Sequence, residues 1–281
     1  MLTTVVENYP GFPEGVMGPE LIAKCREQAK KFGTRFMDGN VEAFSVKSDN
    51  NSKDGIKENK ENIYEIVVDG EKIEAESVII ASGASARTLG LESEKKYWAR
   101  GVHTCATCDG YFYSGKDVVV VGGGDSACEE SLFLSKLVIS VTIVHRKAEF
   151  RASKIMQERV FGNSKIKVVW NSAVDEILGD GKKVTGVKLK NVEGGEKTEV
   201  KTDAVFLAIG HIPNSAAFKG VLELDENGYI KADDRMRTKL PGVFAAGDVH
   251  DKIYKQAVTA AGMGCQAALE VERYLEGITR Q

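Results

Sequence analysis

The stretch KDVVVVGGGDSACEESLFLSKL, residues 116–137, decides the fold. Four valines enter a glycine-rich turn, and an amphipathic helical pattern follows, which is the order of a dinucleotide-binding βαβ unit. Gly122 permits the tight turn, Gly124 lets the backbone approach a pyrophosphate, and the small Ala127 allows the helix to pack on the strand. We expect the phosphates at the helix N-terminus, where free N–H groups point outward. The alternative is a plain glycine turn between a strand and a helix.

The residues that follow the next predicted strand indicate which nucleotide the unit binds. A unit that binds NAD carries Asp or Glu about 20 residues after the loop, where the carboxylate holds the ribose hydroxyls. This chain has His145, Arg146 and Lys147 there, with Arg151 close behind. Cations suit a 2′-phosphate, so the pattern predicts NADPH. A solvated basic loop would fit the composition but not the position.

Strand-like and helical segments alternate through the rest of the chain. The apolar run at 76–86 predicts a buried strand, residues 141–152 predict a further strand and its exit loop, and the chain ends in a long helix of small residues. This alternation predicts an α/β fold with parallel sheets. Residues 48–62 are polar and predict a long hairpin loop between two strands. Residues 19–32 predict a packing helix whose apolar face carries Leu21, Ile22, Cys25, Ala29 and Phe32.

Length and charge limit the class of protein. The 281 residues suffice for two domains, and 38 basic against 41 acidic residues give a net charge of −3. Nothing in this balance indicates a nucleic-acid or membrane partner. The first residues show no signal-peptide pattern, and no apolar run approaches the roughly 18 residues of a membrane span. We therefore expect a soluble, cytoplasmic protein.

Two of the five cysteines form a CxxC motif at Cys105 and Cys108. Such a motif is typical of half a zinc site, of a short-loop disulfide or of a redox pair. A structural zinc site needs four ligands, and no second CxxC or His pair is present. His103, Cys105, Cys108 and Asp109 could supply four donors, but they crowd into seven residues. A redox dithiol is the favoured interpretation, and no metal is expected.

Several short motifs in one order resemble the low-molecular-weight thioredoxin reductases over essentially the whole chain. They are CATCDG (105–110), VVVVGGGDSA (118–127), HRKAEFRA (145–152), AIGHIPN (208–214), GVFAAGDV (242–249) and YKQA (254–257). The resemblance implies a homodimeric flavoenzyme that passes electrons from NADPH to FAD, to its own disulfide and then to thioredoxin. It also implies two Rossmann-like, three-layer α/β domains. The NADPH domain, 87–213, would be inserted into an FAD domain made of 1–86 and 214–281.

The resemblance assigns roles around the CxxC motif. Cys108 would be the thiol that faces the flavin, Cys105 the thiol that exchanges with thioredoxin, and Asp109 the acid/base. A thiolate is the attacking species, and a neighbouring carboxyl group can move its proton. A turn residue before a glycine is the alternative for Asp109. His103 has no catalytic counterpart in the family and is interpreted as structural.

The same resemblance identifies cofactor and partner contacts. Asp248 matches the residue that holds the ribityl chain of FAD, and Lys255, where relatives often carry Arg, starts the segment at the flavin ring. The other predicted cofactor contacts are Asn8, Gly83, Val249, Gln256 and Ala257 together with Asp125, Ser126, Ile209 and Gly210. Arg100, Tyr111 and Phe112 match the surface that grips thioredoxin, although core packing is an alternative for the two aromatic residues.

One departure from the family pattern concerns the start of the chain. The family begins with its own strand–GxGxxG–helix unit, and no such fingerprint occurs here before residue 83. We therefore expect a βαβ-sized piece of about 30 residues or more to be missing from the FAD domain, through a shortened gene model. A short form that binds flavin weakly is the alternative, which would leave an NADPH-binding remnant. A reductase for another dithiol partner is a further alternative.

Overall fold

The computed structural model describes residues 5–47 and 62–279. By its internal contacts the chain divides into two compact units. The first unit contains Met1–Ala29 and Ala86–Gly210, and the second contains Lys30–Ser85 and His211–Gln281. We describe each unit by itself.

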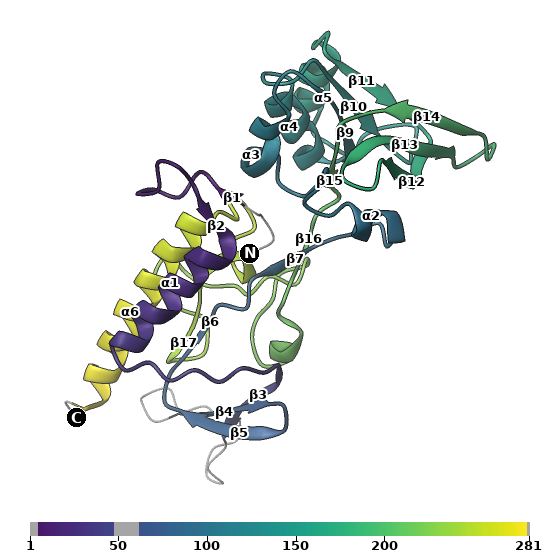
Figure 1. Cartoon of the computed structure of the whole chain (residues 1–281). Coiled ribbons are helices and arrows are strands. Elements are labelled where there is room, and N and C mark those ends of the chain that lie inside the picture. The colour runs from purple at the N-terminus through teal and green to yellow at the C-terminus, as the bar shows by residue number, and fades with distance from the viewer. Residues whose placement is uncertain (1–4, 48–61, 280–281) are drawn as a thin grey trace. The chain divides into compact units, whose positions relative to one another are not determined.

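A five-stranded parallel sheet forms the centre of the first unit (Figure 1). Its strand order is β11-β10-β9-β15-β8, and all four pairs of neighbours run parallel. The predicted α/β fold with a parallel sheet is confirmed. The strands are β8 (Val102–His103), β9 (Asp117–Gly122), β10 (Ser140–Val144), β11 (Ile166–Val169) and β15 (Ala204–Ala208).

The four valines of β9 explain how this sheet is covered on two faces. Val118 and Val120 lie in one buried cluster, and Val119 and Val121 lie in another, because successive side chains of a strand point to opposite faces. The first cluster includes Ala127 and Leu134 of a helix, and the second includes residues of a three-stranded antiparallel sheet. The helices are α3 (Ala106–Asp109), α4 (Asp125–Leu134) and α5 (Lys154–Phe161), and the second sheet is β12 (Ser172–Gly179), β13 (Val184–Asn191) and β14 (Lys197–Lys201).

The predicted helix at 19–32 exists, but its predicted buried face is largely wrong. α1 (Gly18–Lys31) follows the antiparallel pair β1 (Val5–Val6) and β2 (Val16–Met17). Leu21 is buried with Val6 and Val16, whereas Ile22 is 51 % exposed, Phe32 is 78 % exposed and Cys25 is exposed. The buried cluster against this helix is too small to cover the whole apolar stripe. Two short helices complete the unit, α2 (Glu92–Lys96) and the 3₁₀ turn η1 (Gly110–Tyr113).

The second unit contains an antiparallel sheet of β3 (Val41–Lys47), β4 (Ile63–Val68) and β5 (Glu71–Ala75). The pairing of β3 with β4 confirms the predicted strands, while positions 48–61 of the predicted hairpin loop lie outside the described residues. β6 (Val78–Ile80) pairs in parallel with β17 (Val243–Ala245). Phe44, Tyr64 and Phe218 form the aromatic part of the core. The remaining elements are η2 (Ala216–Phe218), η3 (Gly247–Val249) and α6 (Ala257–Thr279).

Two short strands lie where the chain passes between the units. β7 (Ala84–Ala86) and β16 (His211–Pro213) form a two-stranded sheet, visible as neighbouring ribbons in Figure 1. The Arg87 N–H donates to the Gly210 carbonyl at 2.9 Å, and the Asn214 N–H donates to the Gly83 carbonyl at 2.9 Å. The contact division assigns residues 1–29 to the first unit, whereas the predicted domains group residues 1–86 with the C-terminal segment. The predicted division by cofactor stays a prediction.

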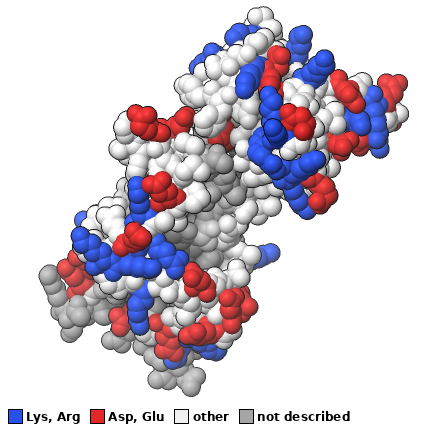
Figure 2. Space-filling view, in the orientation of Figure 1, with Lys and Arg blue, Asp and Glu red and all other residues white. Residues whose placement is uncertain are grey.

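The surface carries charges of both signs. On the face shown in Figure 2, Lys and Arg side chains lie interspersed with Asp and Glu, with uncharged surface between them. Among the helices of residues 5–47 and 62–279, none combines the length and the apolar character needed to cross a membrane.

Candidate active site

Cys105 and Cys108 form a disulfide at the start of α3. Their Cα atoms lie 5.3 Å apart, and both residues are partly buried. The short helix fixes the neighbouring residues, since the Asp109 N–H donates to the Cys105 carbonyl at 3.1 Å. The Thr107 hydroxyl lies 3.4 Å from the Cys105 sulfur. The predicted pair is therefore a bonded disulfide, and a backbone hydrogen bond ties Asp109 to it.

Asp109 belongs to a buried chain of hydrogen-bonding side chains. Its Oδ2 lies 2.9 Å from Nδ1 of His103, and Nε2 of His103 lies 2.8 Å from the Tyr113 hydroxyl. Asp109 is 6 % exposed and His103 is 8 % exposed. Burial raises the pKa of Tyr113 to about 12, and the charges of Asp109 and Asp203 act in the same direction. Neither His103 nor Tyr113 was expected at the site, although a histidine inside a short buried strand beside the CxxC motif is the signal that points to it.

A carboxyl group that the sequence does not predict at the site, that of Glu130 on α4, lies near the disulfide. Burial raises the pKa of Glu130 to about 7, while a hydrogen bond from the Ala106 backbone lowers it and the charge of Glu129 raises it. Oε2 of Glu130 is buried without a hydrogen-bond partner among the described residues. Glu130 is three positions after the buried Ala127 and four before the buried Leu134, so the sequence does place a charge on an apolar stripe.

The glycine loop after β9 has the shape that the sequence predicts. A Cβ atom on Gly122 (φ +158°) would lie 2.5 Å from the Ala208 carbonyl oxygen and 2.7 Å from the Ala127 Cβ. A Cβ on Gly124 would meet nothing within 4 Å. Gly122 is therefore required by packing, whereas Gly124, which precedes α4, borders open space. An open backbone position at the start of a ten-residue helix fits a pyrophosphate.

The predicted basic residues lie beside this loop. The Arg151 N–H donates to the Gly123 carbonyl at 2.7 Å, and a Cβ on Gly123 would lie 2.2 Å from the His145 ring. Arg146, Lys147 and Arg151 are exposed, as a site for a 2′-phosphate requires. His145 is only 6 % exposed, and burial lowers its pKa, so it acts as a neutral wall of the site.

Two neighbours of the loop complete this arrangement. Asp125 accepts hydrogen bonds from both the N–H and the hydroxyl of Ser153, each at 2.9 Å, and these bonds lower its pKa. Ser126 is exposed in the first turn of α4. Ile209 and Gly210 follow Ala208, the residue paired with Gly122 across the sheet. The predicted NADPH-contacting residues of the first unit thus gather around one loop.

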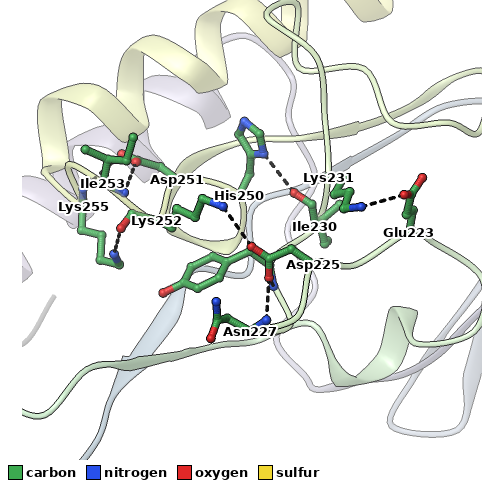
Figure 3. Close-up of polar contacts among 11 residues, drawn as sticks. Glu223, Asp225, Asn227, Ile230, Lys231, His250, Asp251, Lys252, Ile253 and Lys255 are labelled. Carbon is green, nitrogen blue, oxygen red and sulfur yellow. Dashed lines mark hydrogen bonds and ion pairs between the residues drawn. The ribbon is translucent and has the colours of Figure 1, made fainter. Parts of the chain in front are cut away.

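Polar contacts hold the loop of the second unit that carries Lys255, one of the residues predicted to contact the flavin (Figure 3). The Asp251 carboxylate accepts backbone hydrogen bonds from Ile253 at 2.8 Å, Tyr254 at 3.0 Å and Lys255 at 3.1 Å. Burial alone would raise the pKa of Asp251, but these three bonds and the charge of Lys255 hold it below its usual value. The loop is anchored further by the Lys252–Asp225 ion pair at 3.2 Å.

Within this loop Asp248 and Lys255 are the charged residues of the predicted set. Burial and the charge of Asp251 raise the pKa of Asp248, and among the described residues no group donates a hydrogen bond to its carboxylate. Burial lowers the pKa of Lys255, which has a left-handed backbone (φ +50°) and an ammonium group 5.5 Å from the centre of the Tyr229 ring. A partly buried carboxylate of this kind fits ligand hydroxyl groups such as those of a ribityl chain.

The other predicted flavin contacts are distributed over both units. Gln256 and Ala257 lie at the start of α6, and Val249 ends the η3 turn. Gly83 has a left-handed backbone (φ +71°), and a Cβ there would meet nothing within 4 Å. Asn8 follows β1 in the segment that the contact division assigns to the first unit.

The predicted partner residues lie on the surface after the disulfide. Tyr111 is 59 % exposed and Phe112 is 40 % exposed, both on η1, so core packing is wrong for these two residues. Arg100 is exposed and donates to the Lys96 carbonyl. In the described part of the chain no three or more His, Cys, Asp or Glu residues form a group that could hold a metal ion.

Comparisons with known proteins cover nearly the whole chain. The protein-family model for pyridine nucleotide-disulphide oxidoreductases matches residues 1–264. The thioredoxin reductase of Rickettsia conorii is 48 % identical over 98 % of this chain and 86 % of its own length. That of Mycolicibacterium smegmatis is 47 % identical over 98 % of this chain and 84 % of its own. The crystal structure of thioredoxin reductase from Streptococcus pyogenes superimposes with a TM-score of 0.88 at 40 % identity, covering 98 % of this chain and 85 % of that one.

Proposed function

Because the chain belongs to the pyridine nucleotide-disulphide oxidoreductase family, and within it to the thioredoxin reductases, we propose that its Cys105–Cys108 disulfide carries electrons to the disulfide of thioredoxin. The enzyme is an NADPH-dependent disulfide oxidoreductase that uses FAD.

The first unit supplies the NADPH site in this proposal. Gly122 and Gly124 form the loop under the pyrophosphate, with α4 providing free backbone N–H groups. Arg146, Lys147 and Arg151 hold the 2′-phosphate through charge-assisted hydrogen bonds. His145 packs behind the loop against Gly123 and positions the cations that follow it.

The second unit supplies the FAD contacts in this proposal. Asp248 accepts hydrogen bonds from ribityl hydroxyls, and Lys255, Gln256 and Ala257 line the ring from the start of α6. Gly83 leaves its backbone open to the cofactor. When bound, FAD converts the two-electron hydride of NADPH into a form that reduces a disulfide. The N-terminus of α6 favours negative charge beside it.

The dithiol then reduces the partner in two exchange steps. Cys108 receives the electrons, and Cys105 attacks the partner disulfide as a thiolate, forming a mixed disulfide. Cys108 next attacks the Cys105 sulfur, which restores the enzyme disulfide and releases the reduced partner. Asp109 accepts the thiol proton and returns it to the departing thiolate of the partner. The reaction balances, because the two protons of the enzyme dithiol end on the two sulfur atoms of the reduced partner.

Two exposed aromatic residues support a protein partner at this site. Tyr111 and Phe112 directly follow the disulfide helix and present apolar surface to solvent. Exposed aromatic residues of this kind are typical anchors of protein interfaces. We assign the grip on thioredoxin to them and to Arg100.

The assembly and location of the enzyme are also part of the proposal. We propose a homodimer, supported by the exposed apolar side chains of Ile22 on α1 and Phe32 directly after it. We propose the cytoplasm as its location, where thiols are kept reduced. Light scattering of the purified protein measures the mass, and a monomer at micromolar concentration would contradict the dimer.

The observation that carries the proposed function is the Cys105–Cys108 disulfide with buried Asp109 directly after it. The test uses purified protein, NADPH and thioredoxin. A yellow protein that is bleached by NADPH shows flavin binding, whereas a colourless one supports an NADPH-binding remnant. C105S should abolish reduction of thioredoxin while NADPH still bleaches the flavin. Full activity of C105S would remove the role of this cysteine.

A further inference from the structure

Three side chains beside the disulfide form one hydrogen-bonded chain: the buried Asp109 and His103 and the partly buried Tyr113. The two contacts measure 2.9 Å and 2.8 Å, and both side chains of the Asp109–His103 pair are 8 % exposed. Asp109 alone is used in the exchange chemistry proposed above. The two residues behind it have no assigned role.

The chemistry of the three groups fixes the direction of each hydrogen bond. An ionised carboxylate only accepts hydrogen bonds, so Nδ1 of His103 is the donor to Asp109. In a neutral ring Nε2 then accepts, and the Tyr113 hydroxyl donates to it. Tyr113 keeps its proton throughout the neutral range, because its pKa is raised to about 12 by burial and by Asp109. One tautomer of His103 therefore satisfies the whole chain.

Packing holds the His103 ring in the orientation that this tautomer needs. His103 is on β8, directly opposite Phe206 of β15 in the parallel register. The Phe206 ring stacks on His103 with centroids 5.4 Å apart, and Tyr113 meets it edge-on at 5.3 Å. Phe206 is completely buried. The ring is thus clamped between two aromatic side chains and cannot turn without disrupting the core.

Asp109 in turn is fixed at two points. Its backbone N–H bonds to the Cys105 carbonyl at 3.1 Å, and its Oδ2 bonds to His103. Among the described residues no donor pairs with the second oxygen, Oδ1. We propose that His103 is a positioning residue for the dithiol exchange: its Nδ1–H holds Oδ2 of Asp109 and leaves Oδ1 as the oxygen that exchanges a proton with the thiol. Tyr113 sets the tautomer of His103. This inference rests on the proposed acid/base role of Asp109.

Including His103 and Tyr113 in the mechanism does not change its proton balance. Oδ1 of Asp109 takes the proton of the attacking thiol and gives it to the leaving thiolate, while His103 keeps its Nδ1 proton. This is the arrangement in which a third group orients an acid/base residue and stabilises the charged form that the reaction needs. Removing His103 leaves the buried Asp109 carboxylate without the donor that holds Oδ2, so Oδ1 is no longer fixed in position for the thiol.

Other charged groups near this chain lie on neighbouring elements. Lys116, just before β9, places its ammonium group 5.3 Å from the centre of the Tyr113 ring. Asp203, just before β15, acts on Tyr113 through its charge. Glu130 on α4 reaches the Ala106 backbone of the disulfide helix. Because Lys116, Asp203 and Glu130 stay in place, His103 variants isolate the effect on Asp109.

The experiment compares H103F, D109N and the double variant in the flavin-loaded enzyme. One readout is the pH dependence of iodoacetamide alkylation of the reduced dithiol, and the other is the single-turnover rate of thioredoxin reduction. D109N should slow exchange by about 10²-fold or more, the usual range for an acid/base group. H103F should slow it at least about tenfold, shift the alkylation profile in the same direction as D109N, and add nothing to D109N in the double variant.

Two further variants separate positioning from packing. H103N keeps an amide N–H near the place of Nδ1 and should recover part of the rate, and Y113F should cause a weaker loss of the same kind. V160A removes buried apolar atoms from the cluster that contains Phe206, on α5 and away from the His103 ring, so it should lower stability but leave the alkylation profile unchanged. If H103F folds poorly, H103N and Y113F provide the test in its place.

The outcomes distinguish this inference from the function on which it rests. Normal exchange in D109N would overturn the acid/base role of Asp109 and this inference with it. A slow D109N together with a normal H103F, or losses that multiply in the double variant, would overturn the role of His103 alone.

Discussion

The backbone N–H of Arg151 donates a 2.7 Å hydrogen bond to the carbonyl oxygen of Gly123. This bond ties the basic residues after β10 to the glycine loop after β9. The His145 ring lies against the same glycine, at a position where any side chain on residue 123 would collide with it. The pyrophosphate and 2′-phosphate halves of the proposed NADPH site are therefore held at a fixed spacing by the chain itself.

This arrangement predicts how cofactor preference depends on two exposed cations. Replacing Arg146 and Lys147 by Ala should raise the KM for NADPH by about 10- to 100-fold, since charged hydrogen bonds contribute about 1.5–3 kcal/mol each. The KM for NADH should change little, because it has no 2′-phosphate. Steady-state kinetics with both nucleotides give the ratio. Lys182→Ala/Lys190→Ala, which removes two exposed charges elsewhere on the first unit, is the control. An equal loss for both nucleotides would contradict the assignment.

The glycine loop offers a matched pair of variants. G122A places a methyl group 2.5 Å from the Ala208 carbonyl oxygen, so it should lower the unfolding temperature by at least about 4 °C. G124A places it in open space at φ −101°, so the unfolding temperature should stay the same. The KM for NADPH should nevertheless rise about tenfold in G124A, because the methyl group occupies the space of the pyrophosphate. Calorimetry and kinetics measure the two effects, and wild-type NADPH kinetics in G124A would contradict the phosphate site.

Glu130 should make the stability of the enzyme depend on pH. Its pKa rises from 4.5 to about 7 on folding, so the folded state binds more protons between these values. Stability contributed by this group is therefore present below about pH 4.5 and falls as the pH rises to about 7. E130Q should be more stable than the wild type at pH 8, by up to about 3 kcal/mol, and equal to it at pH 4. Thermal unfolding across this range measures the difference.

Glu158 provides the control for this prediction, because its charge does not act on Glu130. It is exposed on α5, so E158Q should change stability by less than about 0.5 kcal/mol at either pH. Identical pH dependence in E130Q and the wild type would show that Glu130 does not titrate between pH 4.5 and 7.

Asp251 should control flavin retention through the loop that it holds. D251A removes the acceptor of three backbone N–H groups and should release the backbone of Lys255, which lies at the start of α6. We expect a loss of about 1–3 kcal/mol of stability and a lower flavin content after purification. D251N keeps one acceptor oxygen and should lose less. D234A, at an exposed carboxylate, is the control, and full flavin content in D251A would contradict the role of the loop.

The sequence predicts those features that depend on local backbone requirements. The turn at Gly122 can be predicted because only glycine fits its backbone conformation and close contacts. The strand before it and the helix after it can be predicted from their own residue patterns. The basic loop is equally local, because Arg146 and Lys147 occupy a fixed position after the next strand. The predicted turn, strand and helix therefore agree with the structure, whereas the contacts of these residues with NADPH stay a prediction.

Features that depend on tertiary packing were harder to predict. The apolar stripe of α1 shows which face avoids water, but not how much of it the rest of the chain covers, and so Ile22 and Phe32 were wrongly expected to be buried. Tyr111 and Phe112 show the opposite case, since aromatic character alone does not distinguish buried residues from exposed ones. The burial of Glu130 beside the disulfide helix and the contact between His103 and Tyr113 form only when α4 and η1 pack next to the disulfide.

The pairing of β7 with β16 also bears on how such a chain could have arisen. The bond between Arg87 and Gly210 brings the first and last residues of the long 87–210 segment to the same spot. A module whose two ends meet can be spliced into a host loop, or removed from it, without stretching the host. Two neighbouring backbone connections are therefore enough to link the 87–210 segment to the rest of the chain.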